Sequence, residues 1–253
     1  MANPFGTSAM ADGYATARPP VHARIWQRVL PHITARVRRA LDVGCGAGLS
    51  TRVLLDCADQ CIGMDRSESM VRHGAATAPG AHFLVGSAEA LPFVAGSIDL
   101  ISAAGSLNYV RLDSFFREAY RVLDANGMLV VYDFSPGRSF RQGSGLEDWF
   151  AEFEQRFPPP PGEGQFLDPG ILGQLAGGFR LHSHEKVDAA VTLSPSFYIR
   201  YIMTETNVPF AVRNGIPRDK IQTWCVDTLR PVWDDEDREI VFPGYYACLT
   251  PVR

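Results

Sequence analysis

The sequence predicts an α/β fold in which helices flank both faces of a doubly wound, mostly parallel sheet. The chain of 253 residues is 46% hydrophobic and 21% charged, which suits one large globular domain. Short apolar runs alternate with segments of helical periodicity from about residue 20 to about residue 135, as βαβ units do. A glycine-rich turn, Gly44 to Gly48, directly follows the first apolar run.

The elements of the first half are expected in alternating order. An opening helix over 20–34 carries apolar side chains at every fourth position, at Ile25, Val29 and Ile33. Ser67 and Asp113 are suitable N-caps for two later helices. The expected strands are 39–43, 61–65, 82–86, 98–103 and 128–134, and the helices between them are 49–57, 67–76 and 113–123.

The alternation weakens after residue 134. Four prolines over 158–161, followed by Gly162 and Gly164, predict a stiff surface loop that no helix or central strand could contain. A strand over 179–191, a largely helical insertion over 193–237 and an aromatic-rich closing strand over 239–249 are expected next. The acidic stretches 147–154 and 234–239 are expected to be solvated surface.

These expectations give one domain over residues 1–253. Its core is expected at 1–135, insertions around one strand that form a lid at 136–238, and the closing strand at 239–253.

Composition disfavours several classes of partner. The formal net charge of −4 makes a basic surface for nucleic acid unavailable at the level of the whole chain. Residues 1–20 lack a cationic region followed by an apolar run, and no stretch reaches the roughly 18 apolar residues of a membrane span. We therefore expect a cytoplasmic protein with no nucleic acid or membrane partner. Five cysteines without CxxC spacing favour reduced thiols over disulfides or a zinc site.

The most informative segment reads Leu41-Asp42-Val43-Gly44-Cys45-Gly46-Ala47-Gly48. Its glycines allow a sharp turn and a close approach of backbone to ligand, and the following helix offers unpaired N–H groups. Asp65 lies 17 residues after Gly48, at the end of the second strand, where a carboxylate can accept both hydroxyls of a ribose. Nicotinamide-binding domains share this pair but prefer G-x-G-x-x-G, and Leu49 occupies the last position of that pattern.

A third block follows at the expected distance. It reads Gly86-Ser87-Ala88-Glu89-Ala90-Leu91-Pro92-Phe93 and is followed by Ser97-Ile98-Asp99-Leu100-Ile101-Ser102. With this block the sequence resembles class I S-adenosylmethionine-dependent methyltransferases, in particular the small-molecule group with a methyltransferase-11/25-like domain. The resemblance runs through about the first 135 residues in order and spacing. It implies a Rossmann-like sheet of seven strands, the last one antiparallel, with helical lid insertions.

The resemblance also implies S-adenosyl-L-methionine as cofactor and S-adenosyl-L-homocysteine as product. By position, Asp65 is expected to bind the ribose hydroxyls, and Asp42 to hold the amino group through water. Ser87 replaces the usual Asp of the family, so its hydrogen bond to adenine should be weaker or differently directed. The other expected cofactor contacts are Tyr14, Gly44, Cys45, Gly46, Gly48, Arg66, Met70, Ala88, Ala103, Ala104 and Gly105.

Methyl transfer needs little catalytic machinery, because the sulfonium is already an excellent leaving group and positioning supplies most of the rate. A base is required only where the proton of an oxygen or carbon acceptor must leave. The candidate catalytic residues are Tyr109, Asp133, His182 and His184. The two histidines alternate along a strand, but no third ligand has a matching interval, so no metal is expected.

The expected acceptor is a small organic molecule, with oxygen and carbon nucleophiles ahead of nitrogen, and the protein is expected to be a monomer or homodimer. Two alternatives remain at this point. One is an NAD(P)-dependent oxidoreductase, which shares the glycine turn and the acid. The other is a non-catalytic protein that binds S-adenosylmethionine or S-adenosylhomocysteine. The Asp/Asn-Pro-Pro-Tyr/Phe block of amino-directed nucleic acid methyltransferases is absent from the sequence.

Overall fold

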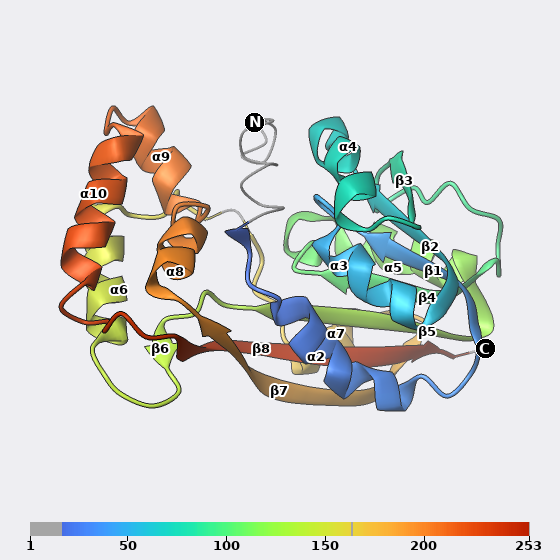
Figure 1. Ribbon diagram of the computed structural model, residues 1–253. Coiled ribbons are helices and arrows are strands. Elements are labelled where there is room, and N and C mark those ends of the chain that lie inside the picture. The colour runs from blue at the N-terminus through green and yellow to red at the C-terminus, as the bar shows by residue number, and fades with distance from the viewer. Residues whose placement is uncertain (1–16, 163, 253) are drawn as a thin grey trace.

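A computed structural model describes residues 17–162 and 164–252 as one mixed sheet with helices on both faces (Figure 1). The sheet order is β3-β2-β1-β4-β5-β8-β6, and β7 pairs with the other edge of β8. The strands are β1 Val37–Val43, β2 Ala58–Asp65, β3 His82–Val85, β4 Ile98–Ala104, β5 Leu123–Phe134, β6 Ser139–Phe140, β7 Phe179–Leu193 and β8 Arg238–Pro251.

Strands β1 to β5 are parallel to their neighbours, whereas β8 runs antiparallel to both β5 and β7. The predicted sheet with an antiparallel last strand is therefore confirmed. The two-residue strand β6 was not predicted; it extends the β5 side of β8 beyond Phe134, through pairing of Ser139 with Val241.

Helices and 3-10 turns connect the strands. The predicted helix 49–57 is a four-residue α-helix that continues as a 3-10 turn, and helices α6 and α7 have no counterpart among the predicted elements. The helical elements are α2 Val21–Val29, η1 Leu30–His32, α3 Leu49–Arg52, η2 Val53–Asp56, α4 Glu68–Thr77, η3 Leu107–Tyr109, α5 Leu112–Val122, α6 Leu146–Arg156, α7 Pro169–Leu175, α8 Pro195–Ile202, α9 Asn207–Arg213 and α10 Arg218–Leu229.

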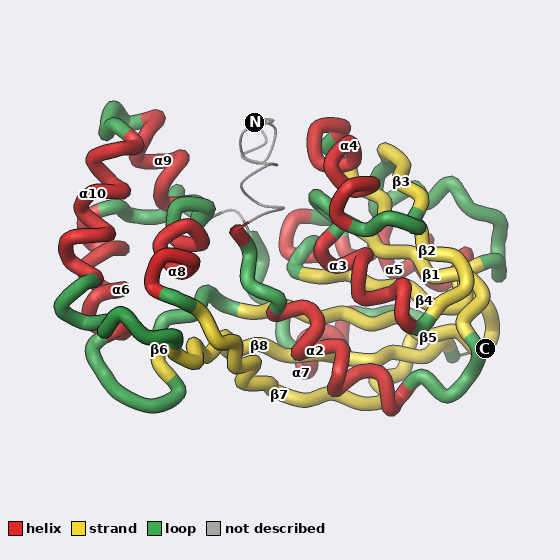
Figure 2. Tube along the Cα trace, viewed as in Figure 1, coloured by secondary structure: helices red, strands yellow, loops and turns green. Residues whose placement is uncertain are grey.

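Alternation along the strands builds two apolar cores. In β5, Val130 and Tyr132 face the core beneath α2, and Leu129 and Val131 face the core beneath α5 and α7. The core beneath α2 continues into the helices α6, α8, α9 and α10, which Figure 2 shows gathered on one side of the molecule. We call these four helices the lid. They lie beyond the carboxyl ends of the parallel strands, where β7 ends and β8 begins.

The expectation of solvated helix or loop surface over 147–154 is wrong for three of its eight residues. This segment lies in α6, and its acidic side chains Glu147 and Glu152 are exposed, but Trp149, Phe150 and Phe153 are buried. The Trp149 ring stacks on Phe153 at 5.8 Å between centroids and on Trp224 of α10 at 5.9 Å. Aromatic residues one helical turn apart form an apolar stripe that the acidic composition conceals.

Within the described residues, no helix combines the length and apolar character required to cross a bilayer.

Because Phe153 is fully buried in the lid core, we expect Phe153→Ala to lower the free energy of unfolding by about 3–5 kcal/mol. The exposed neighbour Glu152 provides the control, and Glu152→Ala should change it by less than about 0.5 kcal/mol. Urea denaturation followed by tryptophan fluorescence measures both. Equal small effects would show that α6 is not part of the core.

Candidate functional site

The glycine turn after β1 is tied to β2 by backbone hydrogen bonds. Gly44 N and Cys45 N both donate to the carbonyl of Met64, at 2.7 and 3.1 Å. Gly44 has φ +71°, and a Cβ on it would lie 2.2 Å from the Cβ of Ser106, which follows β4. Gly46 has φ +51°, and a Cβ on it would meet nothing within 4 Å. Gly44 therefore permits close packing of two loops, whereas Gly46 leaves open space beside the backbone.

The Asp65 carboxylate connects the glycine turn to the start of α4 through two hydrogen bonds. Its Oδ2 accepts a hydrogen bond from Gly46 N at 2.9 Å, and its Oδ1 accepts one from Ser67 N at 2.8 Å. The side chain is only half-buried. Each oxygen keeps a lone pair for another donor, so the carboxylate is held in place and can still bind two hydroxyl groups.

Asp42 lies fully buried at the end of β1. Its Oδ2 accepts hydrogen bonds from the hydroxyls of Ser50 and Thr51, at 2.6 and 2.7 Å, while its Oδ1 has no hydrogen-bond partner among the residues that the structure describes. Burial raises the pKa of this carboxyl to about 6. A buried acceptor oxygen without a donor fits an ammonium group or a bridging water, as expected for the amino end of the cofactor.

The residues predicted to lie beside adenine come from two segments: the start of α4 with the residues before it, and the loop after β3. Met70 is buried on α4, whereas Arg66 is exposed. The Ser87 hydroxyl donates to the Glu89 carboxylate, and Glu89 N approaches Ser87 Oγ at 3.4 Å. The Ser87 proton is thus engaged within its own loop. Its oxygen has a second lone pair that can accept a further hydrogen bond, and the bond to adenine stays a prediction. Ala88 in the same loop is half-buried.

The loop after β4 joins the glycine turn to β5. Gly105 N donates to Tyr132 O at 2.9 Å, and Ser106 Oγ donates to Val43 O at 2.7 Å. Ala104 and Gly105 are half-buried at this edge, but the Ala103 side chain packs in the core beneath α5. Ala103 can therefore contribute only its backbone to a ligand site.

Two of the three remaining predicted contacts, Cys45 and Gly48, pack within the protein. The Cys45 thiol is buried and desolvation raises its pKa, so it is not a reactive thiolate. A Cβ on Gly48 would lie 3.1 Å from the Cα of Gly74, so the absence of a side chain lets α3 pack on α4. Tyr14 lies outside the described residues.

The structure separates the four catalytic candidates into two pairs. Tyr109 and Asp133 line one cavity of about 400 Å³ at the carboxyl edge of β4 and β5. His182 and His184 are exposed on β7, which pairs with the edge of β8 opposite β5. Within 17–162 and 164–252, no group of three potential ligands could hold a metal ion.

Sequence reasoning missed the other residues of this cavity, among them Asn108, Gln165 and Tyr245. Asn108 Nδ2 donates to Asp133 Oδ2 at 2.8 Å. Gln165 Nε2 donates to the carbonyls of Leu107 and Val110, at 2.9 and 3.0 Å. Only Asn108 carried a signal, because it is adjacent to the candidate Tyr109; the other two come from distant segments.

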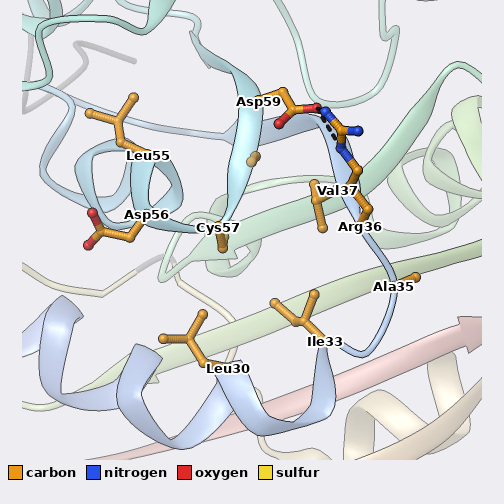
Figure 3. A pocket seen from close by; sticks show the side chains of 10 residues that line it. Leu30, Ile33, Ala35, Arg36, Val37, Leu55, Asp56, Cys57 and Asp59 are labelled. Carbon is orange, nitrogen blue, oxygen red and sulfur yellow. Dashed lines mark hydrogen bonds and ion pairs between the residues drawn. The ribbon is translucent and has the colours of Figure 1, made fainter.

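A second cavity of similar volume, about 400 Å³, lies at the amino ends of β1 and β2 (Figure 3). Leu30, Ile33 and Cys57 line it, beside an ion pair of 2.7 Å between Arg36 and Asp59. These residues precede β1 or begin β2. This cavity is therefore separate from the glycine turn.

Comparisons with known proteins show which family the first half of the chain is similar to. Residues 41–131 match the family model described as a methyltransferase domain. A malonyl-[acyl-carrier protein] O-methyltransferase from Methylococcus capsulatus is 32% identical over 137 residues, 51% of this chain and 50% of that protein. The chain spans about half the length of the curated relatives it matches.

Solved structures extend the similarity in fold. One described as a type II methyltransferase from Anaeromyxobacter dehalogenans has a TM-score of 0.71 at 19% identity, over 89% of this chain and 94% of that chain. A geranyl diphosphate C-methyltransferase from Streptomyces coelicolor A3(2), solved with S-adenosyl-L-homocysteine, has a TM-score of 0.51 at 17% identity, over 89% of this chain and 74% of that chain. Together the comparisons confirm the resemblance to class I S-adenosylmethionine-dependent methyltransferases, and the solved structures confirm the fold.

The two glycines of the turn should respond differently to a methyl group. Both variants introduce alanine at positive φ, which costs about 1–2 kcal/mol. Gly44→Ala adds a clash with Ser106 and should lower Tm further than Gly46→Ala. The extra Cβ of Gly46→Ala projects into open space, so this variant should fold and lose affinity for S-adenosylhomocysteine. Thermal unfolding and calorimetric titration check both; equal Tm values would contradict the packing role of Gly44.

Asp42 should make cofactor affinity depend on pH. The raised pKa of about 6 means that the carboxyl is neutral below this pH and then cannot pair with the ammonium group of S-adenosylhomocysteine. Between about pH 7 and pH 5 the Kd should therefore rise by about tenfold. Methylthioadenosine has the same nucleoside but no amino acid, and its Kd should stay constant. Parallel pH dependences for the two ligands would place the titrating group elsewhere.

Proposed function

We propose that this chain is an S-adenosylmethionine-dependent methyltransferase that acts on a small organic molecule. The observation that carries the proposal is the arrangement at the ends of β1 and β2, where Gly46 leaves space beside a carboxylate, Asp65, that is fixed by two backbone N–H groups. Its core would lie within residues 1–135 and its acceptor-binding lid within 136–238.

The proposed division of roles follows from the geometry. Asp65 binds the ribose hydroxyls, the turn around Gly46 lies along the sugar and the methionine chain, and Asp42 holds the amino group directly or through water. When bound, the cofactor supplies a sulfonium methyl group that a nucleophile can displace in line. The protein contributes a fixed position for both partners and exclusion of water, which together account for most of the rate of such reactions.

Oxygen and carbon are the proposed acceptor atoms, ahead of nitrogen. The relative from Methylococcus capsulatus is named as an O-methyltransferase and the Streptomyces neighbour as a C-methyltransferase, so both chemistries occur among similar proteins. The cavity that contains Asp133 lies at the same sheet edge as the loop after β4. A carboxylate there can accept a proton that leaves an oxygen or carbon acceptor.

Asp65→Ala should weaken S-adenosylmethionine binding by about 2 kcal/mol, because two charged hydrogen bonds are lost. Asp59→Ala is the matched control: Asp59 is an exposed carboxylate at the other end of the same strand, paired only with Arg36, and its loss should leave the Kd unchanged. Calorimetric titration measures both variants. Absence of micromolar binding by the unmodified chain would argue against the proposal.

Two further measurements separate the alternative functions. Labelled methyl should pass from S-adenosylmethionine into a metabolite of a cell extract, and its failure to do so despite tight binding would favour a non-catalytic binding protein. Energy transfer from tryptophan to added NADH should not appear. Its appearance would favour a nicotinamide-dependent oxidoreductase.

A further inference from the structure

We propose that the cavity beside Asp133 holds the methyl acceptor, that this acceptor is a neutral hydroxyl compound with an apolar body, such as a phenol or an enol, and that Asp133 takes its proton. This inference rests on the proposed methyltransferase function and adds the chemical class of the substrate and the residue that contacts it.

The cavity is formed by four segments that meet at the carboxyl edge of the sheet. Asn108 and Tyr109 come from η3, Asp133 and Phe134 from the end of β5, and Tyr245 from β8, with Gln165 from the loop before α7. Its volume of about 400 Å³ lies at the lower end of the range of small-molecule sites. It therefore suits a compact acceptor, or the reactive end of a longer one.

The Asp133 carboxylate is fixed in this cavity. Its Oδ2 accepts from Asn108 Nδ2 at 2.8 Å, and its Oδ1 accepts from Phe134 N at 2.8 Å. Partial burial raises the pKa of this carboxyl, which makes it a stronger base than an exposed aspartate. Burial also raises the pKa of the Tyr245 phenol, with the carboxylates of Asp133 and Asp168 adding to the effect, so Tyr245 remains a neutral donor.

A short chain of contacts connects this carboxylate to the proposed cofactor site. A Cβ on Gly44 would clash with Ser106, and a Cβ on the adjacent Gly105 would lie 2.9 Å from Asp133 Oδ1. The loop after β4 is thus packed between the glycine turn and Asp133. An acceptor that contacts Asp133 would therefore lie next to the loop that also borders the glycine turn. In the proposed complex its oxygen reaches past this loop to within about 3–3.5 Å of the methyl carbon.

The charges of the lining select the class of acceptor. Among the described residues that line the cavity, Asp133 carries the one formal charge, and arginine, lysine and histidine are missing. A carboxylate or phosphate acceptor would face Asp133 without a cation to offset the repulsion. Phe134, Phe166, Leu167, Pro243 and Tyr245 provide apolar walls for a ring or hydrocarbon body.

The proposed step balances without a further reactant. A new bond forms between the acceptor oxygen and the methyl carbon while the bond from sulfur to that carbon breaks. The electron pair of the broken bond stays on sulfur and neutralises the sulfonium. The hydroxyl proton passes to the Asp133 carboxylate and then to solvent, which restores the base.

The test compares two probes with the same naphthalene body on the protein loaded with S-adenosylhomocysteine: 2-naphthol, which is neutral at neutral pH, and 2-naphthoate, which is an anion. We expect 2-naphthol to bind at least about tenfold more tightly, because only the anion is repelled by Asp133. Asp133→Asn should remove this preference, whereas Asp188→Asn, at an exposed position on β7, should keep it. Affinity for S-adenosylhomocysteine should change less than about twofold in both variants.

A second variant tests the same inference if Asp133→Asn does not fold. Ser135 is an exposed residue of the cavity rim, and Ser135→Arg places a cation there with Asp133 intact, so 2-naphthoate should gain at least about tenfold in affinity. Tight binding of S-adenosylhomocysteine without binding of 2-naphthol, or an unchanged preference in both cavity variants, would overturn this inference alone. Failure of the unmodified chain to bind S-adenosylhomocysteine would instead overturn the proposed function.

Discussion

The hydrogen bonds from Gly46 N and Ser67 N to the Asp65 carboxylate are the constraint on which the candidate site depends. They join the turn after β1 to the turn after β2, and so fix the carboxylate relative to the open space beside Gly46. Both donors come from the first residues after parallel strands, where backbone N–H groups have no partner in the sheet. The acid that we propose to bind the ribose is therefore also the group that fixes the turn beside it.

The same sheet edge holds two further carboxylates in different surroundings. Asp42 is fully buried with one unpartnered oxygen, whereas Asp133 is half-buried and paired with Asn108. Burial raises the pKa of both carboxyls, but their positions differ. Asp42 lies at the end of β1, just before the glycine turn, whereas Asp133 lines the cavity. In the proposed function, three acids at the ends of β1, β2 and β5 can therefore serve the amino group, the ribose and the acceptor without competing for one ligand.

Local sequence signals predicted most of the first half of the fold. Gly44 and Gly46 follow the first strand directly, and Asp65 ends the second. The carboxyl ends of parallel strands meet at one edge of a sheet, so the sequence predicts that these residues lie together. The lid was harder to predict. In α6 the buried residues Trp149 and Phe153 lie among acidic residues, and the acidic composition of this segment suggested exposed surface. The cavity could not be predicted, since Asn108, Gln165 and Tyr245 meet only through tertiary packing.

The most direct measurement of the central claim is a crystal structure of the chain with S-adenosylhomocysteine. The account predicts that both ribose hydroxyls donate to the Asp65 carboxylate, that the backbone at Gly46 runs beside the ligand, and that the sulfur faces the cavity containing Asp133. A ligand bound away from Asp65, or a sulfur directed away from that cavity, would contradict it.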